Sequence, residues 1–465
     1  MVEKGQTEGV RMTVQQPVVA GAFYPAERDA LAGQVDGMLG AAHPFDVPVP
    51  KALILPHAGY RYSGALAAAG VRQLRREIKR VVILGPSHRH GFRGVALPNA
   101  TAMATPLGGV PVDGEVVRQL LYQEDVAVVP EAFAQEHSIE VELPFLQRQL
   151  GAFSVVPMVV GDVPTDRLAT LIDMLWGGPE TLIVISTDLT HFLEGAEASR
   201  IDLATAHAIE QVKSAGLTSR EACGHRPLAA FLKVAAQRGM RLTRLALTHS
   251  GHVTGDHARV VGYGAWMAHD ALDARLAPVH RREALSLTAK ALISRARKGK
   301  APAINLASFP VPLQSVAPAF VTLTLKGRLR GCIGSLVAHR PLAEDILANT
   351  VKAGFEDPRF APMTEDEIRE AEIEVAVLSH PGEMAFESEA DLLSQLVPGR
   401  DGLILTSQGK RGTFLPKVWD SLATPETFLN GLKVKAGLPR DHWSGDVRVQ
   451  RYVTEAFKGR IGKAA

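Results

Sequence analysis

The segment VVILGPSH, residues 81–88, is a run of aliphatic and β-branched side chains that ends in polar ones. Three further segments share this composition, namely KALILPHAGY (51–60), FSVVPMVVGD (153–162) and TLIVISTDLTH (181–191). Each run is apolar on both faces, which is typical of strands buried inside a parallel sheet. Stretches with helical spacing lie between them, such as ALAAAGVRQLRRE at 65–77. This alternation predicts an α/β fold in which helices flank a mostly parallel sheet.

The later part of the chain combines its elements differently. AFVTLTLKGRLRGCIGSL (319–336) predicts two strands joined by a turn, and PLAEDILANTVKAGF (341–355) predicts a helix. AEIEVAVLS (371–379) and GLILTS (402–407) predict further strands. Helices mixed with antiparallel strands in this order indicate an α+β domain.

A chain of 465 residues is longer than one hydrophobic core usually supports, so we expect two domains. The apolar pattern is lost in HDALDARLAPVHRR at 269–282, and an amphipathic stretch begins after it. We therefore predict a flexible tail (1–14), an N-terminal domain (15–272), a linker (273–283) and a C-terminal domain (284–465).

Composition excludes several classes of protein. The 51 Lys and Arg residues balance 49 Asp and Glu residues, so no overall positive charge favours nucleic acid or an anionic membrane as a partner. The two cysteines, Cys223 and Cys332, are too few for a disulfide framework and suit a reducing compartment. The polar N-terminus resembles no secretory signal, and no apolar run approaches the ~20 residues of a membrane helix. We expect a soluble, cytoplasmic protein.

Polar side chains follow three of the predicted parallel strands. His57 follows the first run, His88 the second, and Asp188 and His191 follow the run that begins at residue 181. Because ligands of open parallel sheets bind outside the carboxyl ends of the strands, these side chains are expected to converge. Two imidazoles with one anionic ligand form catalytic zinc and non-haem iron sites. Spacing alone leaves Asp188 and Cys223 as alternatives for the third ligand.

Each of these residues also has a structural interpretation. A histidine at a strand end is often only a hydrogen-bonded group, although three such strand ends at one edge weaken this interpretation. Asp188 could cap the following helix, and Cys223 could be a small buried apolar residue. In EHSIEVELPF (136–145), His137 could act as a general acid or base with Glu140 on the same helical face. The carboxylates there could instead favour the dipole of a first helical turn.

The C-terminal domain offers a second candidate cleft. Cys332 lies in LRGCIGS beside Arg330, and neighbouring positive charge would lower the pKa of its thiol. A tightly packed hairpin would show the same glycine-flanked cysteine. Asp357 and Arg359, in FEDPRF (355–360), could support this cleft or form a rigid turn that ends a helix.

Taken together, these motifs make residues up to about 270 resemble the Memo family, whose fold is similar to that of class III extradiol dioxygenases. The matching segments are AGAFYP (20–25), PHAGYRYSG (56–64), LGPSH (84–88), EHSIEVELPF (136–145), STDLTH (186–191) and CGHRP (223–227). Residues from about 281 to 465 resemble an AMMECR domain through LRGCIG (329–334), FEDPRF (355–360), GTFLPKVW (412–419) and KAGLP (435–439).

The resemblance implies one metal ion held by His57, His88 and Cys223. Fe(II) is favoured, with copper and zinc as alternatives. It also implies that Asp188, His191 and His137 line the pocket as catalytic residues. Because the extradiol dioxygenases have a carboxylate as third ligand, a thiolate there weighs against ring cleavage.

The fusion of the two domains is similar to proteins of the AmmeMemoRadiSam system, which implies a radical-SAM partner. Three functions follow from these expectations. The first is a metal-dependent redox enzyme acting on a small-molecule or peptide substrate, and the second is a binding protein that delivers metal or substrate to the partner. The third is a zinc-dependent hydrolase, which would share the ligands but not the redox behaviour.

Overall fold

The computed structural model describes residues 13–45, 47–270 and 276–460. Apart from its last two residues, the expected tail lies outside the described residues, and so do residues 273–275 of the expected linker. Helix α9 (Pro278–Lys298) begins within the rest of the stretch expected as linker. None of the helices in the described ranges combines the length and apolar character needed to cross a membrane.

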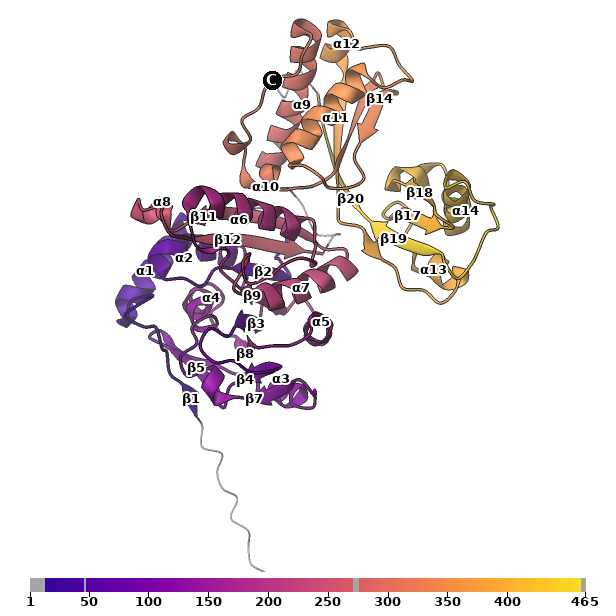
Figure 1. The fold of residues 1–465 in the computed structure, drawn as a ribbon. Coiled ribbons are helices and arrows are strands. Elements are labelled where there is room, and N and C mark those ends of the chain that lie inside the picture. Colours follow the sequence, from indigo (N-terminus) through magenta and orange to yellow (C-terminus); the bar gives the residue numbers. More distant parts are fainter. Residues whose placement is uncertain (1–12, 46, 271–275, 461–465) are drawn as a thin grey trace, which may run out of the picture.

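A mixed sheet forms the centre of the N-terminal half (Figure 1). Its central neighbours β2, β9, β3 and β8 are all parallel, which confirms the prediction made from the four apolar runs. The strands lie in the order β10 (His191–Leu193), β12 (Val260–His269), β2 (Ala52–Leu55), β9 (Thr181–Ser186), β3 (Arg80–Pro86), β8 (Ser154–Val160), β4 (Val95–Leu97) and β7 (Val126–Val128), with β11 (Arg241–His249) paired to β12.

Helices cover both faces of this sheet, so consecutive strand residues enter different cores. Leu53 and Leu55 pack into one hydrophobic cluster, whereas Ile54 packs into the other. The first cluster includes residues of α1 (Arg28–Ala41), α2 (Tyr60–Val71) and α4 (Leu143–Leu150), and the second includes residues of α5 (Thr165–Met174), α6 (Gly195–Glu210) and α7 (His225–Gln237). Burial on both faces explains why these strands are continuously apolar.

Smaller elements surround the sheet. A three-stranded sheet contains β1 (Val14–Gln15), β5 (Ala102–Thr105) and β6 (Gly108–Pro111). The remaining helices of this half are α3 (Gly114–Leu120), α8 (Gly251–Thr254) and the 3₁₀ turns η1 (Pro130–Ala132) and η2 (Glu140–Glu142).

The C-terminal half contains two antiparallel four-stranded sheets, each with its own core, and Figure 1 shows them as separate lobes. The first sheet has the order β14 (Arg328–Gly334), β13 (Ala319–Leu325), β15 (Glu372–Leu378) and β20 (Thr454–Arg460), and packs with α9, α10 (Val311–Gln314), α11 (Leu342–Phe355) and α12 (Glu365–Glu370). The second has the order β16 (Gly382–Glu383), β19 (Arg448–Tyr452), β17 (Gly402–Ser407) and β18 (Lys410–Phe414). The remaining described elements of this half are α13 (Glu389–Gln395), α14 (Pro425–Lys435) and the 3₁₀ turns η3 (Leu306–Ser308) and η4 (Pro416–Asp420). The α+β prediction is confirmed, and the division into two sheets is new.

A buried ion pair of the N-terminal half forms hydrogen bonds with the C-terminal half. The Nε atom of Arg244, on β11, lies 2.8 Å from Oε1 of Glu210, on α6. The Nη2 atom of Arg244 donates to the carbonyl of Gln314, which belongs to the C-terminal half. The second carboxylate oxygen of Glu210 accepts from the backbone N–H of Val316 at 2.7 Å. Since these partners come from both halves, the pair contributes to how the halves dock.

Candidate metal centre

His57 is fixed by groups at the end of the neighbouring strand β9 and just after it. The whole residue is 1% exposed, and its backbone N–H donates to Asp188 Oδ1 at 2.9 Å. Its Nδ1 lies 2.8 Å from the hydroxyl of Ser186, which itself donates to the carbonyl of Ser138. Because a serine hydroxyl has one proton, it accepts from the Nδ1–H of His57. The lone pair of His57 Nε2 is thereby left as an acceptor.

His88, after β3, is oriented by a carboxylate. Glu136 accepts from the backbone N–H of His88 at 2.6 Å, and its other oxygen lies 2.9 Å from His88 Nδ1. These hydrogen bonds hold the pKa of Glu136 at about 2 even though burial opposes its charge. A carboxylate on one imidazole nitrogen fixes the tautomer and leaves the other nitrogen available as a ligand.

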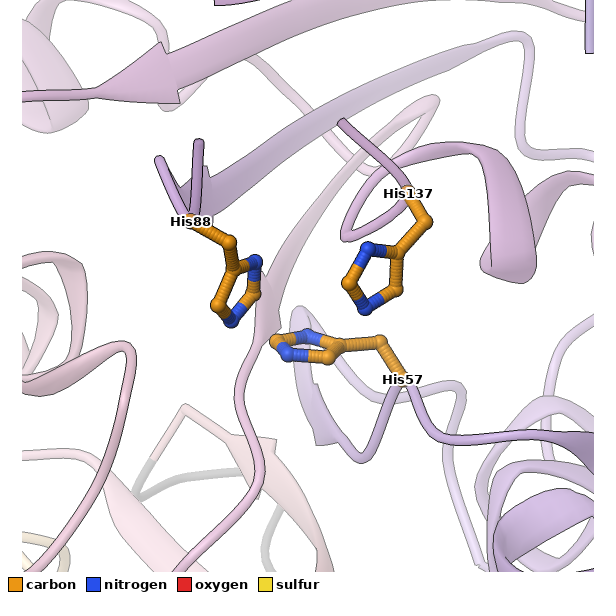
Figure 2. A group of neighbouring side chains, drawn as sticks. All are labelled: His57, His88 and His137. Atoms are coloured by element: carbon orange, nitrogen blue, oxygen red, sulfur yellow. The ribbon is translucent and has the colours of Figure 1, made fainter. Parts of the chain in front are cut away.

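Three imidazoles meet at this edge of the sheet, as Figure 2 shows. The ring of His57 lies 5.1 Å from that of His88 and 5.5 Å from that of His137, while His88 and His137 stack at 4.8 Å. Among the described residues, these three form the group of metal-ligating side chains whose ligand atoms all lie within 4.8 Å of one another. His137 precedes η2 and was expected as an acid-base group, so its place among the close imidazoles is a finding of the tertiary structure.

The environment favours the neutral form of His57 and His137. Burial, aided by the neighbouring histidines, lowers the pKa of His57 well below its usual value. Burial also lowers the pKa of His137 to about 4, against the opposing effect of Glu136. Neutral imidazole is the form that binds a metal ion, so His57 and His137 are ready ligands at neutral pH.

Cys223 contacts the group from one side. Its Sγ lies 3.3 Å from His57 Nε2 and accepts from the backbone N–H of Asp188 at 3.2 Å. Burial, with a smaller contribution from Asp188, raises the pKa of this thiol to about 12. A bound cation beside the sulfur would oppose that shift, because a coordinating thiol is deprotonated. Cys223 is therefore within reach of the centre but outside the set of three close imidazoles.

Asp188 and His191 lie at the wall of a cavity of about 560 Å³ that His137 also lines. Burial raises the pKa of Asp188 to about 7, against the hydrogen bond from His57. His191 places its Nδ1 2.8 Å from the carbonyl of Leu189, so its Nε2 is the free nitrogen. The cavity thus brings together the three residues that the resemblance placed around the pocket.

The model of the Memo-like protein family matches residues 15–267, which is more than half of the chain. The chain belongs to the Memo family. A second family model, AMMECR1, matches residues 285–457, so the predicted fusion of the two domains is confirmed.

Related proteins match this chain over nearly their whole length. A MEMO1 family protein of Aeropyrum pernix is 36% identical over 280 residues, covering 55% of this chain and 99% of the relative. A MEMO1 family protein of Aquifex aeolicus is 32% identical over 264 residues, covering 54% and 98%. The crystal structure of an uncharacterized protein from Pyrococcus horikoshii is 29% identical, covers 39% of this chain and 91% of that chain, and has a TM-score of 0.36.

Two buried residues that sequence reasoning missed support the Memo-domain centre. Ser186 Oγ, the acceptor for His57, lies 3.0 Å from Glu142 Oε1. Glu142 is fully buried, and burial raises its pKa to about 8. Glu142 is the third acidic residue of EHSIEVELPF, and an acidic residue among apolar ones is the signal in the sequence that could have identified it. Glu140 of the same segment serves elsewhere, because it accepts from the backbone N–H groups of Val18 and Val19.

In the AMMECR1 domain the candidate cleft residues form two hydrogen-bonded pairs. Asp357 accepts from the backbone N–H of Cys332 at 2.9 Å and pairs with Arg359, whose Nη2 also donates to the carbonyl of Cys332. Arg330 forms a two-point ion pair with Glu367 at 2.9 and 3.0 Å. Hydrogen bonds thus connect the FEDPRF turn to β14. The reactivity of Cys332 stays a prediction.

Glu136→Gln is expected to weaken metal binding about 10–100-fold, because the outer partner of a ligating histidine contributes that much to affinity. The amide keeps the shape of the side chain but can no longer hold His88 through a charged hydrogen bond. Titration of the apoprotein with Co(II), followed by visible absorption, measures the change. Glu124→Gln, at an exposed carboxylate outside this centre, is the control, and equal affinities of the two variants would contradict the expectation.

Glu142→Gln is expected to change how stability depends on pH. The folded pKa of Glu142, about 8, lies above its usual 4.5, so its favourable contribution is complete below pH 4.5 and is lost as pH rises towards 8. Because a tenfold change in proton affinity corresponds to about 1.4 kcal/mol, the effect on unfolding free energy reaches a few kcal/mol. As pH rises from 5 to 8, the melting temperature of the variant should increase relative to that of the parent. Calorimetry measures both melting temperatures. Parallel pH profiles would show that Glu142 is not responsible.

Proposed function

We propose that the Memo domain binds one metal ion and uses it in an oxidation–reduction reaction on a small-molecule or peptide substrate. The observation that carries the proposal is the set of three close imidazoles at the carboxyl edge of the sheet, beside the thiol of Cys223. Nitrogen and sulfur donors of this kind suit Fe(II), copper and zinc, and Fe(II) is favoured for redox chemistry.

The donor set fits such an ion. His57 and His88 each engage Nδ1 with a protein group, which leaves Nε2 as the ligand atom. We assign His57, His88 and Cys223 as the ligands, in line with the family resemblance, and His137 as an imidazole within reach of the same position. When bound, the ion would supply a Lewis acid and, for iron or copper, a redox centre.

The protein's own residues would bind the substrate and move its protons. The cavity brings Asp188, His137 and His191 to one wall, and Phe23, which stacks edge-on with His137, lies beside them. His191 has a free Nε2 and sits where it could give or take a proton as a general acid or base. Asp188, with a pKa of about 7, could share that task while its Oδ1 holds the backbone of His57.

The first experiment measures metal content by elemental analysis after anaerobic purification. A stoichiometry near one iron or copper per chain supports the redox enzyme, and zinc alone would favour a hydrolase. Absence of metal in the wild-type protein under these conditions would overturn the proposal. Depletion of metabolites from a cell extract, with His191→Ala as the matched inactive variant, then tests turnover.

The roles of Cys223 and His137 can be separated spectroscopically. In the Cu(II)- or Co(II)-loaded protein, a thiolate ligand gives an intense charge-transfer band that an imidazole does not. Cys223→Ser is expected to lose this band, while His137→Ala keeps it. Retention of the band in Cys223→Ser would remove Cys223 from the ligand set.

A second candidate function is delivery of metal or substrate to a radical-SAM partner without turnover. The observation that favours it is the contact between the AMMECR1 domain and the Memo domain, which includes the ion pair of Arg241 with the buried Glu455. Under this alternative, metal would be bound but no metabolite would be consumed, and the bound metal would transfer to the partner. Steady product formation by the isolated protein would exclude it as the sole function.

A further inference from the structure

A cavity of about 220 Å³ lies between the Memo domain and the C-terminal half. The Memo domain contributes the end of α6 and the start of β11, and the other half contributes residues from the segments 312–318, 336–338 and 378–381 together with Arg411 and Gln450. It shares no lining residue with the cavity at the metal centre. Ligand sites occur preferentially at domain interfaces, and this volume lies below the about 300–1,000 Å³ typical of drug-sized ligands. It therefore suits a small ligand.

The interior of this cavity is apolar. Leu242, Val316 and Leu378 line it and are each 3% exposed. They come from β11, from the segment before β13 and from the end of β15, so apolar walls face the space from both halves of the molecule. A ligand with an apolar body would remove these walls from water, which is favourable by about 25 cal/mol for each Å².

Some of the charged residues that line the cavity have an ion-pair partner, and others have none in the part of the chain that the structure describes. Glu210 is neutralised by Arg244, and Arg241 pairs with Glu455 at 3.2 Å. Lys213 and Arg411 also line the cavity but are exposed, and within the described ranges neither has an ion-pair partner. One comes from the Memo domain and the other from β18. Two unpaired cations thus accompany an apolar interior.

We propose that this interdomain cavity binds a small amphipathic anion, with its apolar body inside and its carboxylate or similar group between Lys213 and Arg411. Lysine and arginine both bind carboxylates through charge-assisted hydrogen bonds. Because the walls come from both halves, the ligand stabilises their docked arrangement by mass action. This site is independent of the proposed redox function.

The test uses octanoate as the probe, with the full-length protein and isothermal titration calorimetry. Octanoate is expected to bind saturably at one site per chain with Kd below about 1 mM. Octanamide, which has the same chain without the charge, should bind at least about fivefold more weakly, and octylamine should not compete. Absence of saturable octanoate binding, or equal affinity for octanamide, would overturn the proposal.

Variants locate the site. Lys213→Gln and Arg411→Gln are exposed substitutions that leave the fold intact, and each should weaken octanoate binding about three- to tenfold. Their combination should approach the affinity for octanamide. Arg440→Gln, at an exposed arginine of the same lobe outside the cavity, is the matched control and should bind as the parent does. Unchanged affinity in the double variant would place octanoate elsewhere and refute the assignment.

Discussion

The His57→Ala variant is expected to lose stoichiometric metal binding, with affinity reduced by at least about 100-fold. Loss of an outer partner already costs 10–100-fold, and His57 is an inner candidate whose Nε2 faces Cys223 at 3.3 Å. Its ring also neighbours both other imidazoles, so its removal opens the centre of the group. The measurement is metal retained per chain after anaerobic desalting.

His252→Ala is the matched control, because His252 is an exposed histidine whose ring stacks on His249 rather than on the candidate centre. It should retain the metal content of the parent. Circular dichroism and melting curves establish that His57→Ala is folded. A folded His57→Ala protein with parental metal content would show that the three imidazoles are not the binding site.

The Arg244→Met variant is expected to lose about 3–5 kcal/mol of unfolding free energy. Its guanidinium is the counter-charge of Glu210, and both side chains are almost fully buried. Without Arg244, the carboxylate must either remain buried and unpaired or take up a proton. The first transition in urea unfolding, followed by tryptophan fluorescence, is expected to move to lower urea concentration.

Glu210→Gln combined with Arg244→Met separates charge from packing. The double variant leaves no unpaired charge, so it should recover a large part of the lost stability. Arg226→Met is the control, since Arg226 pairs with Asp162 on the surface, where ion pairs contribute about 0–1 kcal/mol. If Arg244→Met unfolded like this surface control, the buried pair would have no special role in holding the halves together.

Local sequence was sufficient to predict the central strands. The runs that became β2, β3, β8 and β9 are short, apolar on both faces and separated by helical spacing. Such patterns depend on which side chains are buried along a few residues, so they can be recognised without long-range information. The same argument predicted that His57 and His88 would meet, because parallel strands end at one edge.

His137 could not be placed by this argument. It lies in a loop before the 3₁₀ turn η2, and no strand end directs it to the edge. Its approach to His57 and His88 depends on the path of segment 130–142, which is held by Glu136 through the backbone N–H groups of His137 and Ser138. Hydrogen bonds across 48 residues, such as Glu136 to His88, leave no periodic trace in the sequence.

The sequence by itself determined the α/β and α+β character, the two family resemblances and the strand-end residues of the candidate centre, because these depend on local burial patterns and ordered motifs. Only the tertiary structure decided that three imidazoles lie together, that Ser186 and Glu142 support His57, and that a cavity with apolar walls lies between the two docked halves. These features arise where segments distant in the chain pack against one another. Their distances are set by the whole fold, which no single segment encodes.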